Sequence, residues 1–150
     1  MAYRRMLLKD LIRNDHFIML PHSSQCLYIH LLLEADDDGF VSSPLSVLRL
    51  TRTTVEDLKN LLDMEYILAF SSGVILIKNW CQHNRIRKDR YRSSILTERH
   101  YITKLDNGTY KILEDCKRYC NQPATTCQTD GCHPDNLFDA SLDDNRVPNG

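Results

Sequence analysis

The hydrophobic positions of the chain form three helix-like groups, followed by two strand-like runs. The first group is "SSQCLYIHLLLEA", residues 23–35, where Leu27 and Leu31 mark one wide apolar face. Ser23 or Ser24 is expected to cap this helix, because either hydroxyl can bond a free backbone amide of the first turn. The polar stretch "DDDGF" then ends the helix.

The second and third groups also carry helix start signals. "SPLSVLRL", residues 43–50, predicts a short helix with Ser43 as its cap and Pro44 in the first turn. "TTVEDLKNLLDMEY" is the clearest helix signal in the chain, and Thr53 and Glu56 have the spacing of a capping box. Its apolar face repeats at helical spacing, through Val55, Leu58, Leu61 and Leu62.

Two β-prone runs, "YILAF" and "VILIKNW", follow the third helix and are separated by "SSG". Gly73 can take the positive φ that a tight hairpin needs. Three helices followed by a hairpin is the order of a winged helix-turn-helix, so we expect a mainly α fold with a small β-hairpin. "TKLDNGTYKI" predicts a second small hairpin about Asn107 and Gly108.

Length and composition indicate one modest domain with extensions. The chain has 150 residues, of which 42% are hydrophobic and 26% are charged. We expect the winged helix-turn-helix in residues 1–80, a basic extension in residues 81–118 and a disordered acidic tail in residues 119–150. No membrane span or signal peptide is expected, and Cys26 and Cys81 in apolar-looking segments suggest free thiols in the cytoplasm.

The net charge of −1 hides a segregated charge distribution. Residues 78–118 hold eleven Lys or Arg against five Asp or Glu, a charge of +6, whereas residues 1–77 carry −3 and residues 119–150 carry −4. The densest part is residues 85–92, "RIRKDRYR", where Asp89 alone opposes five cations. This stretch is either a surface that binds a polyanion or a solvated linker.

Three separated stretches carry a family resemblance: "LLLEADDDGFV", "SSGVILIKNW" and "RKDRYRSSI". In this order they resemble the amino-terminal winged-helix domain of phage replisome organiser (replication initiation) proteins from Gram-positive hosts, which is related in kind to DnaD-like primosomal initiators. The resemblance runs from about Leu11 to Ile112. It departs at Cys81 and Arg85, and the chain ends at Gly150, where such initiators usually continue. The residues that match individually are Trp80, Asn84, Lys88, Asp89, Arg90 and Tyr91.

This resemblance implies a DNA-binding protein that starts phage or prophage DNA replication in the cytoplasm of a bacterial host cell. Its implied partners are DNA, either duplex or single-stranded, and a host helicase loader or other primosome proteins. A homo-oligomer is also open. Two alternative functions remain: a protein–protein interaction or oligomerisation module of a primosome, and a winged-helix transcriptional regulator.

The candidate DNA-contacting residues are cations, because Lys and Arg bind phosphate without reading sequence. They are Lys78, Arg85, Arg87, Lys88, Arg90 and Arg92, with Arg49 and Arg52, before the third helix, as secondary candidates. Trp80 and Tyr91 are expected either to stack on bases or to pack the basic stretch onto the hairpin. The third helix is acidic, which disfavours a place in a major groove and favours a core or protein–protein role for that helix.

No motif for enzyme chemistry is present: the sequence has no P-loop, no glycine-rich cradle and no Ser/His/Asp order. His83 and Asn84 beside the basic stretch suggest a nuclease only if a second ligand cluster exists, and none is found. The three aspartates before Gly39 do not have calcium-loop spacing and indicate a polar turn. Zinc is disfavoured because the spacings are too wide among Cys116, Cys120, Cys127, Cys132 and His133. We expect no enzyme activity, no metal and no cofactor.

Overall fold

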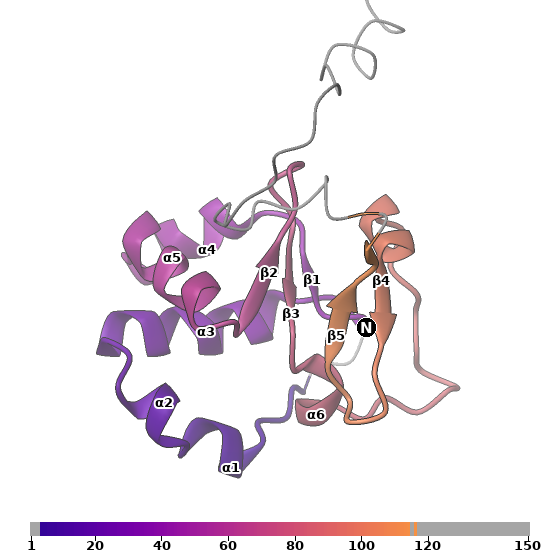
Figure 1. The fold of residues 1–150 in the computed structure, drawn as a ribbon, viewed down its shortest axis with the longest axis horizontal. Coiled ribbons are helices and arrows are strands. Elements are labelled where there is room, and N and C mark those ends of the chain that lie inside the picture. The colour runs from indigo at the N-terminus through magenta and orange to yellow at the C-terminus, as the bar shows by residue number, and fades with distance from the viewer. Residues whose placement is uncertain (1–3, 115, 117–150) are drawn as a thin grey trace, which may run out of the picture.

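The structure is a computed structural model that describes residues 4–114 and 116 (Figure 1). Short helices lead into three longer ones, and small strands follow. The elements are α1 (Lys9–Ile12), α2 (Asp15–Ile18), α3 (His22–Glu34), β1 (Phe40–Val41), α4 (Pro44–Thr51), α5 (Val55–Asp63), β2 (Ile67–Ala69), β3 (Ile75–Ile77), α6 (Trp80–His83), the 3₁₀ helix η1 (Thr97–Tyr101), β4 (Ile102–Lys104) and β5 (Tyr110–Ile112).

The strands form two antiparallel sheets. The first has the order β1-β3-β2, with Phe40 opposite Leu76 and Ile67 opposite Ile77, and the second is the β4–β5 hairpin. Helices α3, α4 and α5 lie on one side of the first sheet and the β4–β5 hairpin lies on the other (Figure 1). Successive side chains of a strand point to opposite faces, yet all three residues of β3 are buried, because both faces of that strand are covered.

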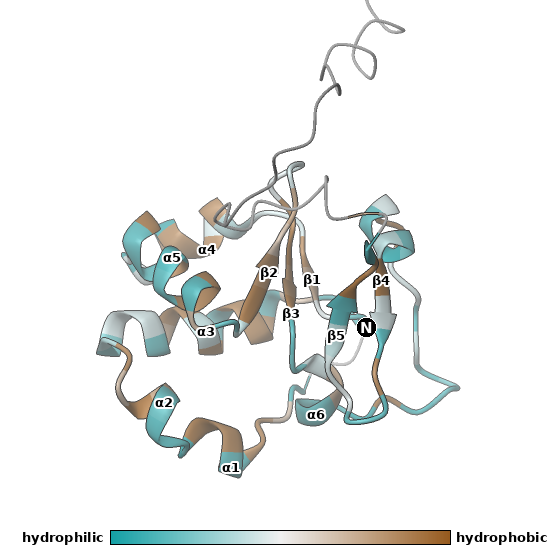
Figure 2. Ribbon diagram, in the orientation of Figure 1, coloured by the Kyte–Doolittle hydropathy of each residue, from teal (hydrophilic) through white to brown (hydrophobic). Residues whose placement is uncertain are grey.

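The core lies between the first sheet and α3, and its strands are the brown, hydrophobic ribbons of Figure 2. Leu27, Leu31 and other apolar residues of α3 are fully buried. Phe17, Tyr28 and Tyr66 bring α2, α3 and the start of β2 together, with edge-to-face ring centroids 5.4 to 5.5 Å apart. The apolar periodicity therefore predicts this face correctly.

The capping box of α5 is shifted by one residue from the expected pair Thr53 and Glu56. Thr54 is the N-cap, its hydroxyl accepts the Asp57 amide, and the Asp57 carboxylate accepts the Thr54 amide at 2.9 Å. This shift places the Asp57 carboxylate toward α3, where it accepts two serine hydroxyls. A tertiary contact therefore selects between two neighbouring caps of equal local quality.

The two serines expected to cap α3 do not cap it. Pro21 is the N-cap residue, with no side-chain cap bond, and Ser23 and Ser24 instead donate to Asp57 Oδ1 at 2.5 and 2.9 Å. In α4 the expected positions are confirmed, because Ser43 is the N-cap residue and Pro44 lies in the first turn, but the Ser43 hydroxyl makes no cap bond and pairs with the Ser46 hydroxyl at 2.8 Å. The serines of α3 thus join it to α5.

Both hairpins are confirmed. Gly73 has φ +88° between β2 and β3, and Gly108 has φ +81° between β4 and β5. The expected strand through Trp80 is wrong at its end, because β3 stops at Ile77 and Trp80 begins α6. Strand β1 was not expected, since two residues are too few to show an alternating pattern.

The structure is a mixture of helices and small sheets, with more strands than the mainly α fold expected from the sequence. The stretch expected to be a basic extension contributes Tyr110 and Ile112 to the core. The expected tail, residues 119–150, lies outside the described residues. Within the described part of the chain, no helix is long and apolar enough to cross a membrane.

Candidate nucleic-acid interface

The turn after α3 has a rigid backbone that presents two carboxylates. We call Asp36, Asp37 and Asp38 the acidic turn. Asp36 Oδ1 accepts the amides of Asp38 at 3.0 Å and Phe40 at 2.9 Å, which closes the turn on itself. Gly39 has φ +93°, and a Cβ at that position would lie 2.6 Å from Trp80 Cγ. The turn therefore requires glycine, and it leaves the other two carboxylates free to bind distant residues.

Those two carboxylates hold the basic stretch, which we call the basic segment (residues 85–92). The Tyr91 hydroxyl donates to Asp38 Oδ1 at 2.7 Å, and the Ser94 amide donates to Asp38 Oδ2 at 2.7 Å. The Arg92 amide donates to Asp37 Oδ2 at 3.1 Å. Burial and the Asp38 bond raise the pKa of Tyr91 to about 12, so its hydroxyl keeps the donated proton.

The acidic turn also binds the amino-terminal residues. The Arg5 guanidinium lies 3.1 Å from Asp37 Oδ1, donates to the Ala35 carbonyl at 2.6 Å and lies 5.0 Å from the centre of the Trp80 ring. Trp80 is 2% exposed, and its indole donates to the Asp37 carbonyl at 2.9 Å. Of the two roles expected for Trp80, this burial fits packing and not base stacking.

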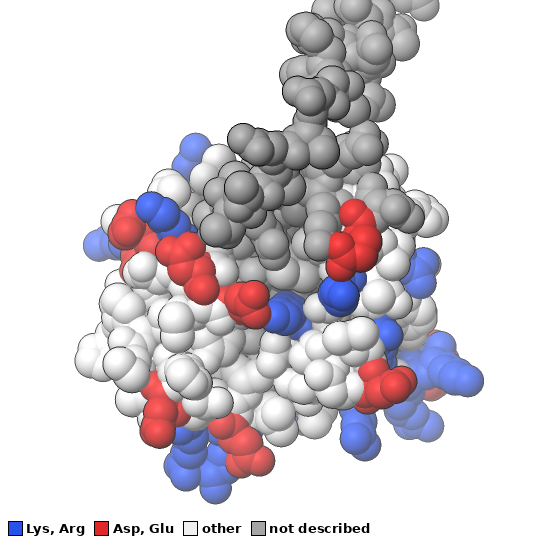
Figure 3. All heavy atoms as spheres, viewed as in Figure 1, with Lys and Arg blue, Asp and Glu red and all other residues white. Residues whose placement is uncertain are grey.

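The cations of the basic segment face solvent. All five are exposed, and the acidic turn holds only the end of the segment, at Tyr91 and Arg92. Arg87 and Asp89 form a loose pair at 3.6 Å. Figure 3 shows blue spheres gathered at the lower right, where the segment projects between α6 and η1 in Figure 1. The exposed cations are Arg85, Arg87, Lys88, Arg90 and Arg92.

The other candidate cations lie elsewhere. Arg49 is in α4 and Arg52 is its C-cap, so both lie across the first sheet from the basic segment (Figure 1). Lys78 Nζ lies 2.7 Å from Glu65 Oε2. The tip of the first hairpin is also engaged, because Ser72 donates to the buried carboxylate of Glu98. The structure thus brings five of the eight candidate cations together.

His83 and Asn84 bind the amino-terminal segment. Leu8 donates its amide to His83 Nδ1 at 2.8 Å, so the ring proton lies on Nε2, 3.0 Å from the Tyr28 hydroxyl. Burial lowers the pKa of His83 to about 4. Asn84 Oδ1 accepts the Met6 amide at 2.9 Å. His83 therefore serves packing, and the Asn84 side-chain carbonyl joins α6 to the amino-terminal segment, which the sequence did not indicate.

Helix α5 exposes less acid than its sequence suggests. Burial alone would raise the pKa of Asp57, but the hydrogen bonds of Ser23, Thr54 and Ser24 outweigh it and lower the pKa. The carboxylate of Asp57 faces α3 and not solvent. The acids exposed on α5 itself are Glu56 and Asp63.

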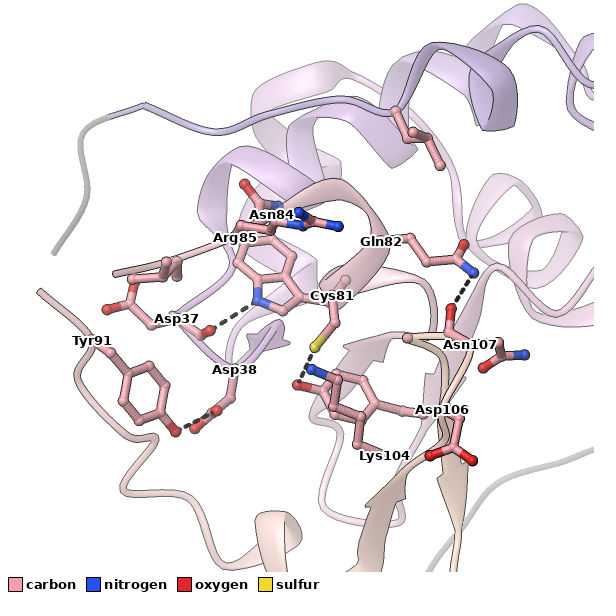
Figure 4. Close-up of a pocket in the computed structure, with 15 residues that line it drawn as sticks. Asp37, Asp38, Cys81, Gln82, Asn84, Arg85, Tyr91, Lys104, Asp106 and Asn107 are labelled. Atoms are coloured by element: carbon pink, nitrogen blue, oxygen red, sulfur yellow. Dashed lines mark hydrogen bonds between the residues drawn. The ribbon is translucent and has the colours of Figure 1, made fainter. Parts of the chain in front are cut away.

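A groove of about 730 Å³ lies between α6, the basic segment and the β4–β5 hairpin. Figure 4 shows Asn84 and Arg85 on one wall, Lys104, Asp106 and Asn107 on the other, and Tyr91 with the acidic turn at one end. A second hollow of about 400 Å³ has Asp38, Lys104 and Tyr110 among its lining residues, as the groove does.

The sequence did not indicate this groove. Lys104 was expected in the second hairpin, without a role in binding. Asp37 and Asp38 were assigned to a local turn only. The sequence did contain one signal for this contact. The basic segment has no acid of its own except Asp89, and the carboxylates of Asp37 and Asp38 can accept its hydrogen bonds.

Comparison of the chain with known protein families, with curated proteins and with solved structures finds no match. The resemblance to replisome organisers therefore stays a prediction, and a function has to be argued from the residues and their geometry.

Proposed function

We propose that this protein is a DNA-binding replication initiation protein of a phage or prophage, which holds DNA through phosphate contacts of the basic segment. One observation carries the proposal. The carboxyl-terminal end of this segment is held by Asp37 and Asp38 through Tyr91, Arg92 and the following Ser94, while its five cations remain exposed. In this role the protein works in the cytoplasm of a bacterial host.

A segment anchored at one end binds a polyanion at a lower entropy cost than a free, solvated linker does. A free loop loses conformational entropy when it binds, whereas a loop already held at Tyr91, Arg92 and Ser94 has lost much of it on folding. Arginine forks bind phosphate oxygens in pairs, and four of the five cations are arginines. Contacts of this kind set the affinity and the position of DNA but give no base preference.

The order of the elements supports a winged-helix fold. Helix α3, strand β1, helices α4 and α5, and the β2–β3 hairpin follow one another in the order of a winged helix-turn-helix, and β1 pairs with β3 at the sheet edge. In this proposal β2–β3 is the wing and α5 stands at the place of the recognition helix. The exposed acids Glu56 and Asp63 disfavour a DNA contact through α5 and so favour the basic segment in this proposal.

The proposal is tested by equilibrium binding to a labelled duplex, measured by fluorescence anisotropy. One variant changes the five cations of the basic segment to glutamine. The matched control changes five other exposed cations to glutamine, Arg4, Lys9, Arg13, Lys59 and Lys111, and so removes the same charge. We expect the first variant to lose most of its affinity and the second to lose little. Equal losses would mean that net charge alone drives binding.

A second candidate function is a protein-interaction module, and it is favoured by exposed apolar side chains on α4 and α5. Leu45, Leu50 and Val55 are 57, 71 and 65% exposed. A contiguous exposed apolar patch often marks a partner surface, and these three side chains are the candidates for one. Light scattering separates the two functions: a dimer that dissociates in a Leu50→Ser variant, in a protein without DNA affinity, would favour this candidate.

A further inference from the structure

We propose that the groove between α6 and the β4–β5 hairpin binds an unpaired stretch of single-stranded nucleic acid. This inference rests on the proposed function and adds to it the form of nucleic acid that the protein prefers. The basic segment forms one border of the groove through Arg85 and Tyr91. A strand held by the basic segment therefore passes directly into the groove.

Two cations face each other across the groove. Arg85 follows α6 on one wall and Lys104 ends β4 on the other (Figure 4). Both are exposed, and among the described residues neither has an ion-pair partner. The second hollow, which also has Lys104 in its lining, adds Arg99 and His100. Cations in this arrangement follow a phosphate backbone along the groove.

The carboxylates along the groove are largely neutralised. Asp37 is paired with Arg5 in a buried contact, and Asp38 lies 3.3 Å from Arg99 Nε and accepts two hydrogen bonds. Asp106 is exposed on the hairpin and is the carboxylate that remains against Arg85 and Lys104. The local charge thus favours an anion, with one acid available to accept the exocyclic amine of a base.

The groove also has groups that suit bases. Asn84 is 8% exposed, and its buried Nδ2 has no hydrogen-bond partner among the residues that the structure describes, whereas its Oδ1 accepts the Met6 amide. An unpaired buried donor is costly, and a base oxygen or ring nitrogen would satisfy it. Tyr91 is 38% exposed at the end of the groove, where its ring face can stack on a base.

The size of the groove selects unpaired nucleotides. About 730 Å³ is within the range of small-molecule sites, roughly 300 to 1,000 Å³. It admits one or two nucleotides with their bases turned in. A duplex keeps its bases stacked inside and is limited to the exposed cations of the basic segment.

Cys81 reports occupancy of the groove without any mutation, because it lines the groove, whereas Cys26 is exposed on α3. Maleimide modification of each thiol is followed by peptide mass spectrometry. The probes are an oligothymidylate of about 12 nucleotides, the matching oligouridylate, a duplex of the same length and poly-glutamate of equal charge. We expect each single strand at saturation to slow modification of Cys81 at least fivefold and to leave Cys26 unchanged, with little effect from the duplex or poly-glutamate. Protection by oligothymidylate alone would restrict the ligand to DNA.

Three outcomes of this experiment overturn the inference. If oligothymidylate binds by anisotropy and Cys81 reacts at its free rate, the groove is empty and the single-strand inference alone fails. If poly-glutamate protects Cys81 equally, the groove recognises anionic polymers such as an acidic protein segment, and not bases. If neither form of DNA binds at all, the proposed function fails as well.

A matched pair of variants tests the phosphate contact separately. Lys104→Gln removes a cation of the groove. Lys111→Gln removes a cation of the same hairpin, whose side chain pairs with Glu114 at 3.3 Å. For oligothymidylate, Lys104→Gln is expected to reduce the steepness of the log–log salt dependence by about 0.7, the value for one single-strand phosphate contact. Lys111→Gln is expected to leave it unchanged. Equal slopes in both variants and the wild type would contradict the inference.

Discussion

Replacing Asp38 by asparagine separates anchoring of the basic segment from bulk charge, because the two effects have opposite signs. Removal of a negative charge next to five cations should strengthen DNA binding if only net charge matters. If the carboxylate is needed to hold the segment in place, the same substitution should weaken binding. The sign of the change therefore decides between the two explanations.

The magnitude follows from three contacts of the carboxylate. Asp38 accepts the Tyr91 hydroxyl and the Ser94 amide, both at 2.7 Å, and lies 3.3 Å from Arg99. A hydrogen bond to a charged group contributes about 1.5–3 kcal/mol, and the pair with the exposed Arg99 contributes at most about 1 kcal/mol. Asparagine keeps one acceptor oxygen, so about 2 kcal/mol of anchoring is lost. This corresponds to binding about 10- to 30-fold weaker, since 1.4 kcal/mol is tenfold.

The assay is anisotropy with a labelled duplex at fixed salt, with thermal melting to confirm that each variant is folded. Tyr91→Phe removes one anchor without a change of charge and should also weaken binding. Asp106→Asn removes an exposed acid that makes no anchoring contact and should bind as tightly as the wild type or slightly tighter. If Asp38→Asn behaves like Asp106→Asn, and Tyr91→Phe has no effect, the anchoring argument is refuted.

Three further predictions concern stability. The pKa of His83 is about 4 in the folded protein, below its ordinary 6.5, so the unfolded chain binds the proton at higher pH than the folded protein does. The contribution of His83 to the free energy of unfolding is therefore fully present above about pH 6.5, and it falls by about 3 kcal/mol as the pH is lowered to 4. Chemical denaturation at several pH values should show a smaller fall of the free energy of unfolding in His83→Gln and an unchanged fall in His16→Gln. The same pH dependence in His83→Gln and the wild type would contradict this prediction. Gly39→Ala should cost about 2–4 kcal/mol in chemical denaturation, because its Cβ would clash with Trp80 at positive φ; wild-type stability would show that the turn is not tight. Asp57→Asn should lower the free energy of unfolding by about 2 kcal/mol at neutral pH. Because the pKa of Asp57 is lowered in the folded protein, this difference should vanish as the pH falls below 3.8 through the folded-state pKa. A difference that persists in acid would contradict the role of Asp57 in the cap.

Local patterns predicted the parts of the fold that local physics decides. The apolar stripe of Leu27 and Leu31 and the glycines of two hairpins specify their elements without any distant contact. The cap of α5 was misplaced by one residue because Thr53 and Thr54 are locally equivalent. The serines of α3, 33 and 34 residues away from Asp57, decide between them.

The site was harder to predict, because its contacts join distant residues. Tyr91 and Ser94 lie 53 and 56 residues from Asp38, so no periodicity relates them. The sequence indicated which cations were dense but not what holds them. It also grouped Lys78 with the basic segment, although an ion pair with Glu65, 13 residues away, engages it.

The salt dependence of duplex binding tests the central claim most directly. Anisotropy between about 50 and 300 mM salt gives the slope of log affinity against log salt, and five phosphate contacts predict about −4.5 for the wild type. The variant with glutamine at the five cations of the basic segment should lose nearly all of this slope. A wild-type slope near zero, or a steep slope that persists in the folded variant, would contradict the account.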